Sequence, residues 1–413
     1  MINDSFHYQA GSLWGDGVAL DTIAEAVGTP AYVYSATRLL NNVHRLQTAF
    51  APLSPDIHYS IKANGNLALL RLLKDAGLGM DAVSAGEIYR AQQAGVDPAH
   101  IVYAGVGKTR TEIAYALAAG VGWFNVESHA ELQLLNTLAG ETGQTAQVAL
   151  RLNPGIQAQT HHHIATGHFG AKFGMTPDII QDILAHRADY AHLHIAGLHI
   201  HIGSQLGDVR ETVEAVRAAQ ALAAPYADMR TLNIGGGFPV HYTASDEYPP
   251  PEAFATALVP ALDGWQLMIE PGRSIVADAG MLLVSVLYIK EQGGQRFVIS
   301  DGSMTELIRP ALYDAIHPVI PVRVSDQAAN HEAKPAIVVG PVCESSDVLH
   351  RGALLPPLVA GDRLAVMVAG AYGMVMASNY NMRPRPPEVL VEGDTWRVIR
   401  RRETWQDVLQ FEM

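Results

Sequence analysis

The sequence contains one cysteine, Cys343, so the chain cannot form an internal disulfide. Proteins of oxidising compartments commonly rely on several disulfides, whereas this composition fits a reducing environment. The N-terminus also lacks the basic flank and apolar core that mark a signal peptide. We therefore expect a cytoplasmic protein.

Long apolar runs and positive charge are scarce as well. The apolar run nearest to a bilayer-spanning length, 364–377, contains glycine and tyrosine, so no membrane span is expected. Lysine and arginine number 28 against 41 aspartates and glutamates, giving a formal net charge of −13 at pH 7. That charge disfavours nucleic acid and anionic membranes as partners, but a local pocket could still bind a small anion.

At 413 residues the chain is longer than a single hydrophobic core usually accommodates, so two domains are expected. Through the first two thirds, strand-like segments alternate with helix-like segments that carry an apolar stripe. About eight such βα units are typical of a (β/α)8 barrel. The barrel strands are expected at 57–61, 80–83, 101–104, 123–126, 148–152, 193–200, 232–234 and 267–269.

After about Arg273 the alternation stops, and strands follow one another with few helices between them. Gly393-Asp394 is typical of a hairpin turn between the last two of these strands. The sequence thus predicts an α/β protein with a barrel and a mostly β second domain. The strands of this domain are expected at 275–276, 282–289, 296–300, 336–342, 363–369, 388–391 and 396–399.

Lys62 stands where the first expected barrel strand ends, and active sites of such barrels lie at that end. A desolvated lysine there can lose its proton and form an imine with a carbonyl compound. A solvated surface lysine is the simpler alternative. However, further ionisable residues follow other expected strands, including Glu127, Arg151, His201 and Glu270, so the strand ends together indicate an active site.

Gly235-Gly236-Gly237 follows the seventh expected strand, where backbone N–H groups can approach a phosphate. It is neither a dinucleotide fingerprint nor a P-loop, because Val240 stands at the third glycine position and no Gly-Lys-Ser/Thr follows. An imine-forming lysine, a phosphate cradle and a flat histidine indicate pyridoxal 5′-phosphate. Glu270 is the candidate acid that keeps its pyridine nitrogen protonated, although a solvated ion pair with Arg273 is the alternative.

Histidines are frequent, but we expect no metal site. On a strand, His199 and His201 share one face while His192 and His194 share the other, so the four side chains cannot converge. The run 161–163 consists of histidines in an expected loop and is assigned no role.

Eight motifs together resemble the alanine-racemase-fold decarboxylases, which are pyridoxal-phosphate enzymes of fold type III. In the first two thirds these are H-Y-S-I-K-A-N (58–64), D-A-V-S-A-G-E (81–87), G-L-H-I-H-I-G-S-Q (197–205), I-G-G-G-F (234–238) and E-P-G-R (270–273). The last third narrows the resemblance to the diaminopimelate decarboxylase family through D-G-S-M-T-E-L-I-R-P-A-L-Y (301–313), V-C-E-S-S-D (342–347) and G-A-Y-G-M-V-M-A-S-N-Y-N-M-R-P-R (370–385).

The resemblance implies roles for individual residues. Lys62 would carry the cofactor, with Asp81 close by, His201 stacked on its ring and Glu270 at its pyridine nitrogen. Cys343 would be the acid beside the α-carbon of the substrate. The remaining cofactor contacts, mostly to the phosphate, would come from Ser204, Gly236, Gly237, Gly272, Arg273 and Tyr372, and the substrate contacts from Arg273, Arg309, Tyr313, Glu344 and Tyr372.

The resemblance also implies an obligate homodimer with shared active sites, in which Cys343 and Glu344 come from the partner subunit. It places the barrel domain at 31–275 and a discontinuous β-rich domain at 1–30 and 276–413. The implied reaction is decarboxylation of meso-2,6-diaminoheptanedioate to L-lysine and CO2.

Several other functions stay open on the residues alone. A decarboxylase of ornithine, arginine or a D-amino acid on the same fold would bind a distal cation, and acidic residues would be expected where Arg309 and Tyr313 stand. Guanidinium groups instead suit a second carboxylate on the substrate. A racemase is disfavoured by the acid at Glu270, and an inactive binding homologue by the presence of both Lys62 and Cys343.

Overall fold

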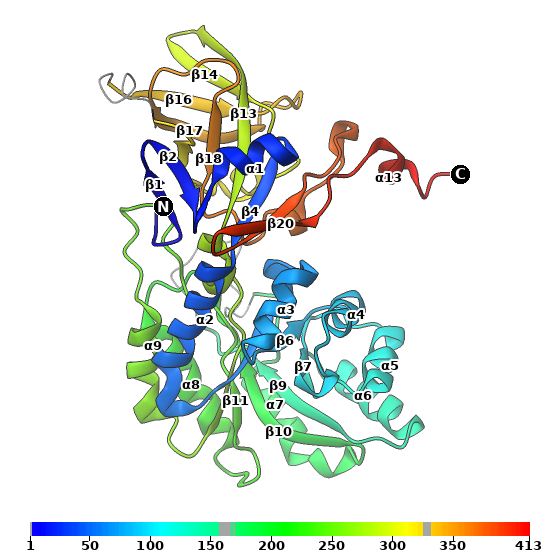
Figure 1. Cartoon of the computed structure of the whole chain (residues 1–413). Coiled ribbons are helices and arrows are strands. Elements are labelled where there is room, and N and C mark those ends of the chain that lie inside the picture. Colours follow the sequence, from blue (N-terminus) through cyan, green and yellow to red (C-terminus); the bar gives the residue numbers. More distant parts are fainter. Residues whose placement is uncertain (1, 157–166, 168–169, 325–331) are drawn as a thin grey trace. The chain divides into compact units, whose positions relative to one another are not determined.

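The computed structural model describes residues 2–156, 167, 170–324 and 332–413, so the histidine run 161–163 lies outside the described residues (Figure 1). The chain forms two compact units. The barrel unit comprises Val43–Val240 and Glu247–Ser274, and the sheet unit comprises Met1–Asn42, His241–Asp246 and Ile275–Met413. Within the described ranges, no helix combines the length and apolar character needed to cross a membrane.

The barrel unit confirms the predicted (β/α)8 barrel. Among the described residues, parallel strands close in the order β10-β11-β12-β5-β6-β7-β8-β9, with β12 and β5 completing the ring through the pairs Met268–Asp56 and Ile269–Ile57. The strands are β5 (Asp56–Ser60), β6 (Gly79–Ala82), β7 (Ile101–Tyr103), β8 (Trp123–Val126), β9 (Ala146–Leu152), β10 (Leu193–Ile200), β11 (Thr231–Asn233) and β12 (Gln266–Ile269).

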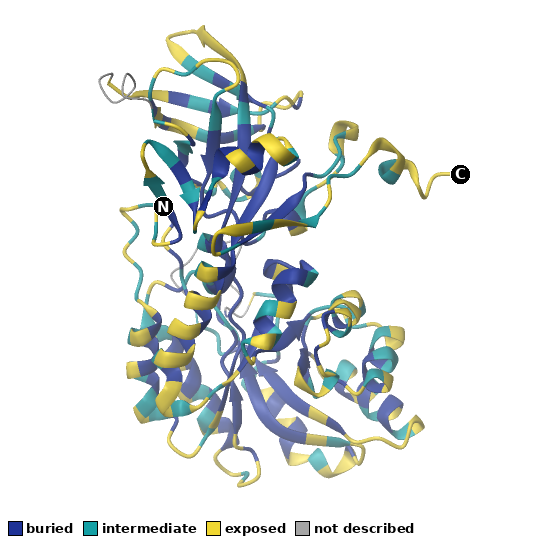
Figure 2. Cartoon of the chain, in the orientation of Figure 1, coloured by how far each residue is buried: buried dark blue, intermediate teal, exposed yellow. Residues whose placement is uncertain are grey.

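Helices pack around this barrel with their apolar stripe inward and their polar face outward (Figure 2). Side-chain caps fix where several of them begin: Ser84, Thr109 and Ser128 each accept a hydrogen bond from the backbone N–H three residues later. The helices are α3 (Leu67–Asp75), α4 (Ala85–Gln93), α5 (Arg110–Ala119), α6 (His129–Glu141), α7 (Pro177–Ala185), α8 (Val209–Ala223) and α9 (Pro251–Leu258).

The sheet unit is mostly β, as predicted. Its main sheet runs β17-β16-β14-β13-β4-β19-β20, β18 pairs with β13 and β15, and β1 to β3 form a small separate sheet. The strands are β1 (Phe6–Gln9), β2 (Ser12–Gly15), β3 (Val18–Ala19), β4 (Ala31–Ser35), β13 (Gly280–Gln292), β14 (Gln295–Ser300), β15 (Val319–Pro321), β16 (Lys334–Val339), β17 (Val348–Leu355), β18 (Arg363–Val366), β19 (Glu388–Glu392) and β20 (Thr395–Arg400). Its helices are α1 (Leu20–Val27), α11 (Arg309–Tyr313) and α13 (Trp405–Leu409), and α2 (Ala36–Phe50) begins in it.

Residues 31–42, which the sequence analysis assigned to the barrel domain, fall in the sheet unit. The reason is hydrogen bonding: β4 pairs with β13 on one side and with β19 on the other. The side chain of Asn42 adds bonds to the Ile275 carbonyl, over 3.0 Å, and to Asp278 Oδ1, over 2.7 Å.

Two local predictions were wrong. Residues 275–276, expected to form a strand, belong to the helical turn α10 (Arg273–Val276), because two residues are too few for an alternating pattern to decide between the two structures. Strand β17 was not predicted at all. Its register against β16 skips Gly352, which has φ +81°, and this extra residue interrupts the alternation by which a strand is recognised.

Candidate active site

Lys62 lies in the short turn η2 (Ile61–Ala63) that directly follows β5. Its Nζ donates to Asp81 Oδ2 over 3.0 Å, and the Asp81 side chain is fully buried while 42% of the Lys62 side chain is exposed. Ser60 Oγ donates to the same Oδ2 over 2.6 Å, whereas Asp81 Oδ1 has no hydrogen-bond partner among the described residues. A buried carboxylate thus anchors an amine that a ligand can still reach.

A second lysine of the barrel shows what a purely structural lysine looks like here. Lys108 is 1% exposed, and its three donors reach Gly105 O (2.9 Å), Asn125 O (2.8 Å) and Glu131 Oε1 (2.7 Å). An ammonium has three donors, so Lys108 is saturated and enclosed. Lys62 is more exposed, which is the difference expected of a reactive amine.

Glu270 follows β12 and is buried at the carboxyl end of the barrel. Its Oε1 accepts hydrogen bonds from Asn125 Nδ2 (2.8 Å) and Asn233 Nδ2 (2.6 Å), and its Oε2 lies 3.4 Å from His199 Nε2. Burial alone raises the pKa of Glu270, but His199, Lys62 and the Asn233 amide outweigh burial and hold the pKa well below its ordinary value. The structure therefore keeps this buried carboxylate ionised.

His201, directly after β10, is held in its neutral form. Burial and the nearby charges of Arg151, Lys62 and His199 lower the pKa of His201 well below its ordinary value, against the opposing effect of Glu270. Arg151 itself donates to Glu127 Oε1 over 2.5 Å in a buried ion pair. A neutral imidazole presents a flat face without a charge that would repel a protonated aromatic ring.

The glycine run after β11 leaves no room for side chains. A Cβ at Gly235 would lie 2.6 Å from His201 Nδ1, one at Gly236 would lie 2.4 Å from the Glu270 carbonyl oxygen, and one at Gly237 would lie 2.6 Å from the Gly203 carbonyl oxygen. Gly235 and Gly237 also have φ of +66° and +93°. Only glycine therefore fits this turn, which brings the backbone close to His201 and Glu270.

Ser204 and Arg273 lie together at the same end of the barrel. Arg273 is buried, and its Nε and Nη2 both donate to Ser204 Oγ, over 3.2 and 3.1 Å. Gly272, just before it, packs against Ser60 and Ala63, since a Cβ there would be 3.0 Å from either Cβ. A hydroxyl and a guanidinium beside a glycine turn suit a phosphate.

These residues fit pyridoxal 5′-phosphate. The glycine turn and the Ser204–Arg273 pair can hold a phosphate, and Lys62 offers an amine for covalent attachment. Glu270 offers an ionised carboxylate, which is the chemistry needed to keep a pyridine nitrogen protonated.

Four of the five residues predicted for the substrate lie in the sheet unit, whereas Arg273 lies in the barrel unit. Arg309 is buried on α11, and its Nη1 donates to Tyr242 OH (3.1 Å) and to His317 Nε2 (2.9 Å). His317 Nδ1 donates to the Met367 carbonyl over 3.0 Å, which leaves Nε2 as the acceptor. Arg309 is thus fixed by a buried tyrosine and a histidine of defined tautomer.

The structure places the other predicted residues of the sheet unit in three segments. Tyr313 is the last residue of α11, and Cys343 and Glu344 lie in the exposed turn between β16 and β17. Tyr372 follows β18 with φ +56°, a conformation that non-glycine residues rarely adopt. The barrel unit therefore gathers the predicted cofactor residues apart from Tyr372, and the sheet unit carries most of the predicted substrate residues.

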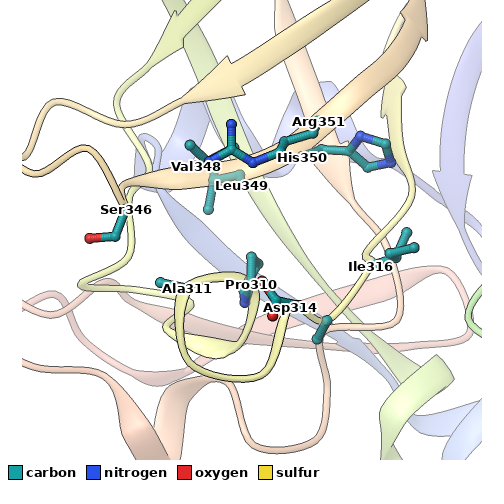
Figure 3. A pocket seen from close by; sticks show the side chains of 10 residues that line it. Pro310, Ala311, Asp314, Ile316, Ser346, Val348, Leu349, His350 and Arg351 are labelled. Atoms are coloured by element: carbon teal, nitrogen blue, oxygen red, sulfur yellow. The ribbon is translucent and has the colours of Figure 1, made fainter.

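A cavity of about 420 Å³ lies between α11 and β17 (Figure 3). Its wall includes Pro310, Ala311 and Asp314, whereas Arg309 and Tyr313, one helical turn apart, share a different face of α11. This cavity is therefore not the one that the predicted carboxylate-binding residues face.

The sequence analysis missed several residues that hold the site together. Asn125 is the last residue but one of β8, and Asn233 is the last residue of β11. A polar amide near the end of a buried strand needs a hydrogen-bond partner, and this signal could have identified both residues. Glu87, inside a quoted motif, caps α4 by accepting from the Val83 N–H over 2.7 Å, and burial raises its pKa to about 7. Tyr242 gave no pattern, because its partner Arg309 is distant in the sequence. His317 is near Arg309 in the sequence but stands in no recognised motif.

Comparison with known proteins agrees with this geometry. The family model described as "Pyridoxal-dependent decarboxylase, pyridoxal binding domain" matches residues 37–277. A diaminopimelate decarboxylase of Aquifex aeolicus is 40% identical over 99% of this chain and 97% of its own, and one of Pseudomonas aeruginosa is 43% identical over 98% of both. A crystal structure of diaminopimelate decarboxylase from M. jannaschii in complex with L-lysine superposes with a TM-score of 0.94, at 36% identity, covering 100% of this chain and 99% of that one.

The Glu270 network generates a prediction. In Asn125→Ala one of the two amide donors to Oε1 is lost, and in Asn125→Asp a second carboxylate faces Glu270 and raises its pKa. We expect kcat/KM to fall about 10- to 100-fold in the first, as loss of a hydrogen bond to a charged group commonly costs, and further in the second. Steady-state kinetics and the pH dependence of the bound-cofactor absorbance measure this, with exposed Asn41→Ala as control. Wild-type kinetics in Asn125→Asp would contradict the role given to this network.

Proposed function

The chain belongs to the diaminopimelate decarboxylases, within the pyridoxal-dependent decarboxylases, and we propose how its own residues carry out the reaction. The enzyme uses pyridoxal 5′-phosphate to decarboxylate meso-2,6-diaminoheptanedioate to L-lysine and CO2. The observation that carries the site assignment is the arrangement at one end of the barrel. There Lys62 pairs with buried Asp81, while His199, Lys62 and Asn233 keep Glu270 ionised.

In this proposal Lys62 Nζ holds the cofactor covalently and Asp81 positions that amine. The backbone N–H groups of Gly236 and Gly237, together with Ser204 and Arg273, would hold the phosphate, His201 would lie against the ring, and Glu270 would face the ring nitrogen. When bound, the cofactor accepts the electron pair that the departing carboxylate leaves behind. Glu270 keeps a proton on the ring nitrogen, because an ionised carboxylate in a buried site stabilises the positive charge there.

Arg309 and Tyr313 are proposed to bind the distal carboxylate of the substrate, and Glu344 its distal amine. Arg309 is pre-oriented by Tyr242 and His317, so little side-chain entropy is lost when a carboxylate binds. Ornithine and arginine carry a positive charge at their distal end, and the buried guanidinium of Arg309 would repel it. The charge of Arg309 therefore favours a dicarboxylate substrate.

Cys343 is proposed to deliver the proton to the α-carbon, directly or through a water molecule that it positions. Together with Glu344 it would reach the active site of the partner subunit in a homodimer with shared sites. The exposure of both side chains in the sheet unit supports this, because residues that act on a buried substrate need a second surface to enclose them. We also propose a cytoplasmic location, supported by the single cysteine.

The role of Lys62 is tested by Lys62→Ala. Turnover is expected to fall about 1,000-fold or more, because no other amine can take its place, and the absorbance of the lysine-bound cofactor is expected to disappear. Absorbance spectra of the dialysed protein and CO2 release measure the two effects. Survival of that absorbance would show that another lysine carries the cofactor.

Substrate selection is tested by Arg309→Ala. We expect kcat/KM for diaminoheptanedioate to fall about 100-fold, the usual cost of removing charge-assisted hydrogen bonds to a carboxylate, while the rate measured with ornithine does not fall. Tyr313→Phe, which removes only a hydroxyl, serves as a milder companion if the buried arginine is needed for folding. An unchanged preference between the two substrates would refute the assignment.

The shared site is tested by mixing two inactive variants. Lys62→Ala and Cys343→Ala subunits, unfolded and refolded together, are expected to regain about a quarter of the wild-type activity, since half the dimers are mixed and each holds one intact site. Either variant refolded alone is the control. No gain of activity on mixing, with dimers present, would mean that both residues serve the same subunit's site.

A further inference from the structure

Two neighbouring side chains of one turn contact two neighbouring side chains of another in the sheet unit. Tyr380 OH donates to Glu344 Oε1 over 2.8 Å, and Asn381 Nδ2 donates to Cys343 Sγ over 3.5 Å. The turns are 36 and 38 residues apart in sequence. Tyr380 and Asn381 both belong to the motif 370–385, and neither has a role in the proposed reaction.

The backbone of the Tyr380–Met382 turn is held in an unfavourable conformation. Asn381 and Met382 have φ of +55° and +56°, in the left-handed region. Asparagine tolerates that region better than most residues, but two consecutive non-glycine residues there cost free energy. Such a conformation persists only where the surroundings fix it.

The chain on both sides of this turn is fixed. The Ser378 N–H donates to the Thr305 carbonyl over 2.9 Å, and Asn379 Nδ2 donates to the Arg383 carbonyl over 3.0 Å and to Glu403 Oε2 over 2.8 Å. Arg383 Nη2 in turn donates to the Asp301 carbonyl over 2.8 Å. Asn381 and Met382 thus lie between residues that hydrogen bonds hold in place. Their left-handed backbone directs the side chains of Tyr380 and Asn381 toward Glu344 and Cys343.

The turn that carries Cys343 and Glu344 is fixed through its backbone by Asp347, which is buried. Asp347 Oδ2 accepts from the Val342 N–H over 2.8 Å, Oδ1 accepts from the Met304 N–H over 2.7 Å, and the Asp347 N–H donates to the Glu344 carbonyl over 3.1 Å. These bonds set the backbone but leave the exposed side chains of Cys343 and Glu344 able to change rotamer. The bonds from Tyr380 and Asn381 are what restrict those two side chains.

We propose that Tyr380 and Asn381 are positioning residues for the substrate: Tyr380 orients Glu344 toward the distal amine, and Asn381 orients the thiol of Cys343. This rests on the roles given to Cys343 and Glu344 under the proposed function. A phenol bound to Oε1 leaves Oε2 to receive the amine. An amide bound to the sulfur as donor leaves the S–H proton to point elsewhere, toward the carbon that it must reach.

The Tyr380 arm is tested with Tyr380→Phe, using holoenzyme. KM for diaminoheptanedioate and the calorimetric Kd for L-lysine, which retains the distal amine, are both expected to rise about threefold to tenfold while kcat changes less than about twofold. In a Glu344→Gln background the same substitution is expected to have no further effect. Tyr288→Phe, at a tyrosine that is 69% exposed, is the matched control.

An unchanged Kd for L-lysine in Tyr380→Phe, or an equal effect with and without Glu344, would overturn this arm. Either result leaves the proposed function standing, because wild-type decarboxylation does not depend on it. Failure of the wild-type protein to decarboxylate diaminoheptanedioate would instead refute the function.

The Asn381 arm uses the fact that Cys343 is the one cysteine of the chain, so thiol alkylation reports on it alone. The amide donor stabilises the reactive thiolate, and Asn381→Asp keeps a residue suited to the left-handed backbone while removing that donor. Iodoacetamide labelling at neutral pH, followed by mass spectrometry, is expected to slow about threefold or more. Asn41→Ala is the control, and wild-type labelling in Asn381→Asp, with an unchanged melting temperature, would overturn this arm.

Discussion

The site depends on keeping a carboxylate charged inside a closed barrel. Moving an isolated carboxylate out of water costs several kcal/mol, and an uncompensated one takes up a proton instead. Glu270 avoids this through two amide donors on one oxygen and a histidine near the other. The donors come from β8, β11 and β10, so the carboxylate is stable only when the barrel is closed around it.

Pairing with a nearby partner also explains how the barrel accommodates its other buried charges. Arg151 pairs with Glu127, Lys108 with Glu131 and two carbonyls, and Lys62 with Asp81. The first two pairs are buried on both sides, whereas Lys62 is the more exposed member of an otherwise buried pair. The barrel therefore tolerates charge where each ion has a local partner, and exposes one amine to a ligand.

The two units divide the chemistry in the mechanism we propose. The barrel unit supplies the cofactor's amine, acid and phosphate contacts, and these come from strand ends whose positions the barrel geometry fixes. The sheet unit supplies the groups that recognise the far end of the substrate. These lie on a turn and a short helix, and hydrogen bonds hold their side chains: Tyr242 and His317 hold Arg309 in a buried network, and Tyr380 holds Glu344 at the surface.

The barrel could be predicted from the sequence alone, because each βα unit carries its own periodicity and most of the expected strands are followed by a polar residue. Lys62 and Glu270 could be proposed from their places at strand ends, whereas the role of Asp81 came from the resemblance to the family. Local pattern failed where it was interrupted or too short, as at the Gly352 bulge in β17 and the helical turn at 275–276.

The residues that support the site become apparent only in the folded chain. Asn125 and Asn233 reach Glu270 across the barrel from 145 and 37 residues away, and Tyr242 reaches Arg309 from 67 residues away. No local pattern encodes such pairs, because a hydrogen bond between distant side chains depends on where closed strands and anchored turns place them. Sequence fixes what each segment can form, and the packing of segments decides which polar groups meet.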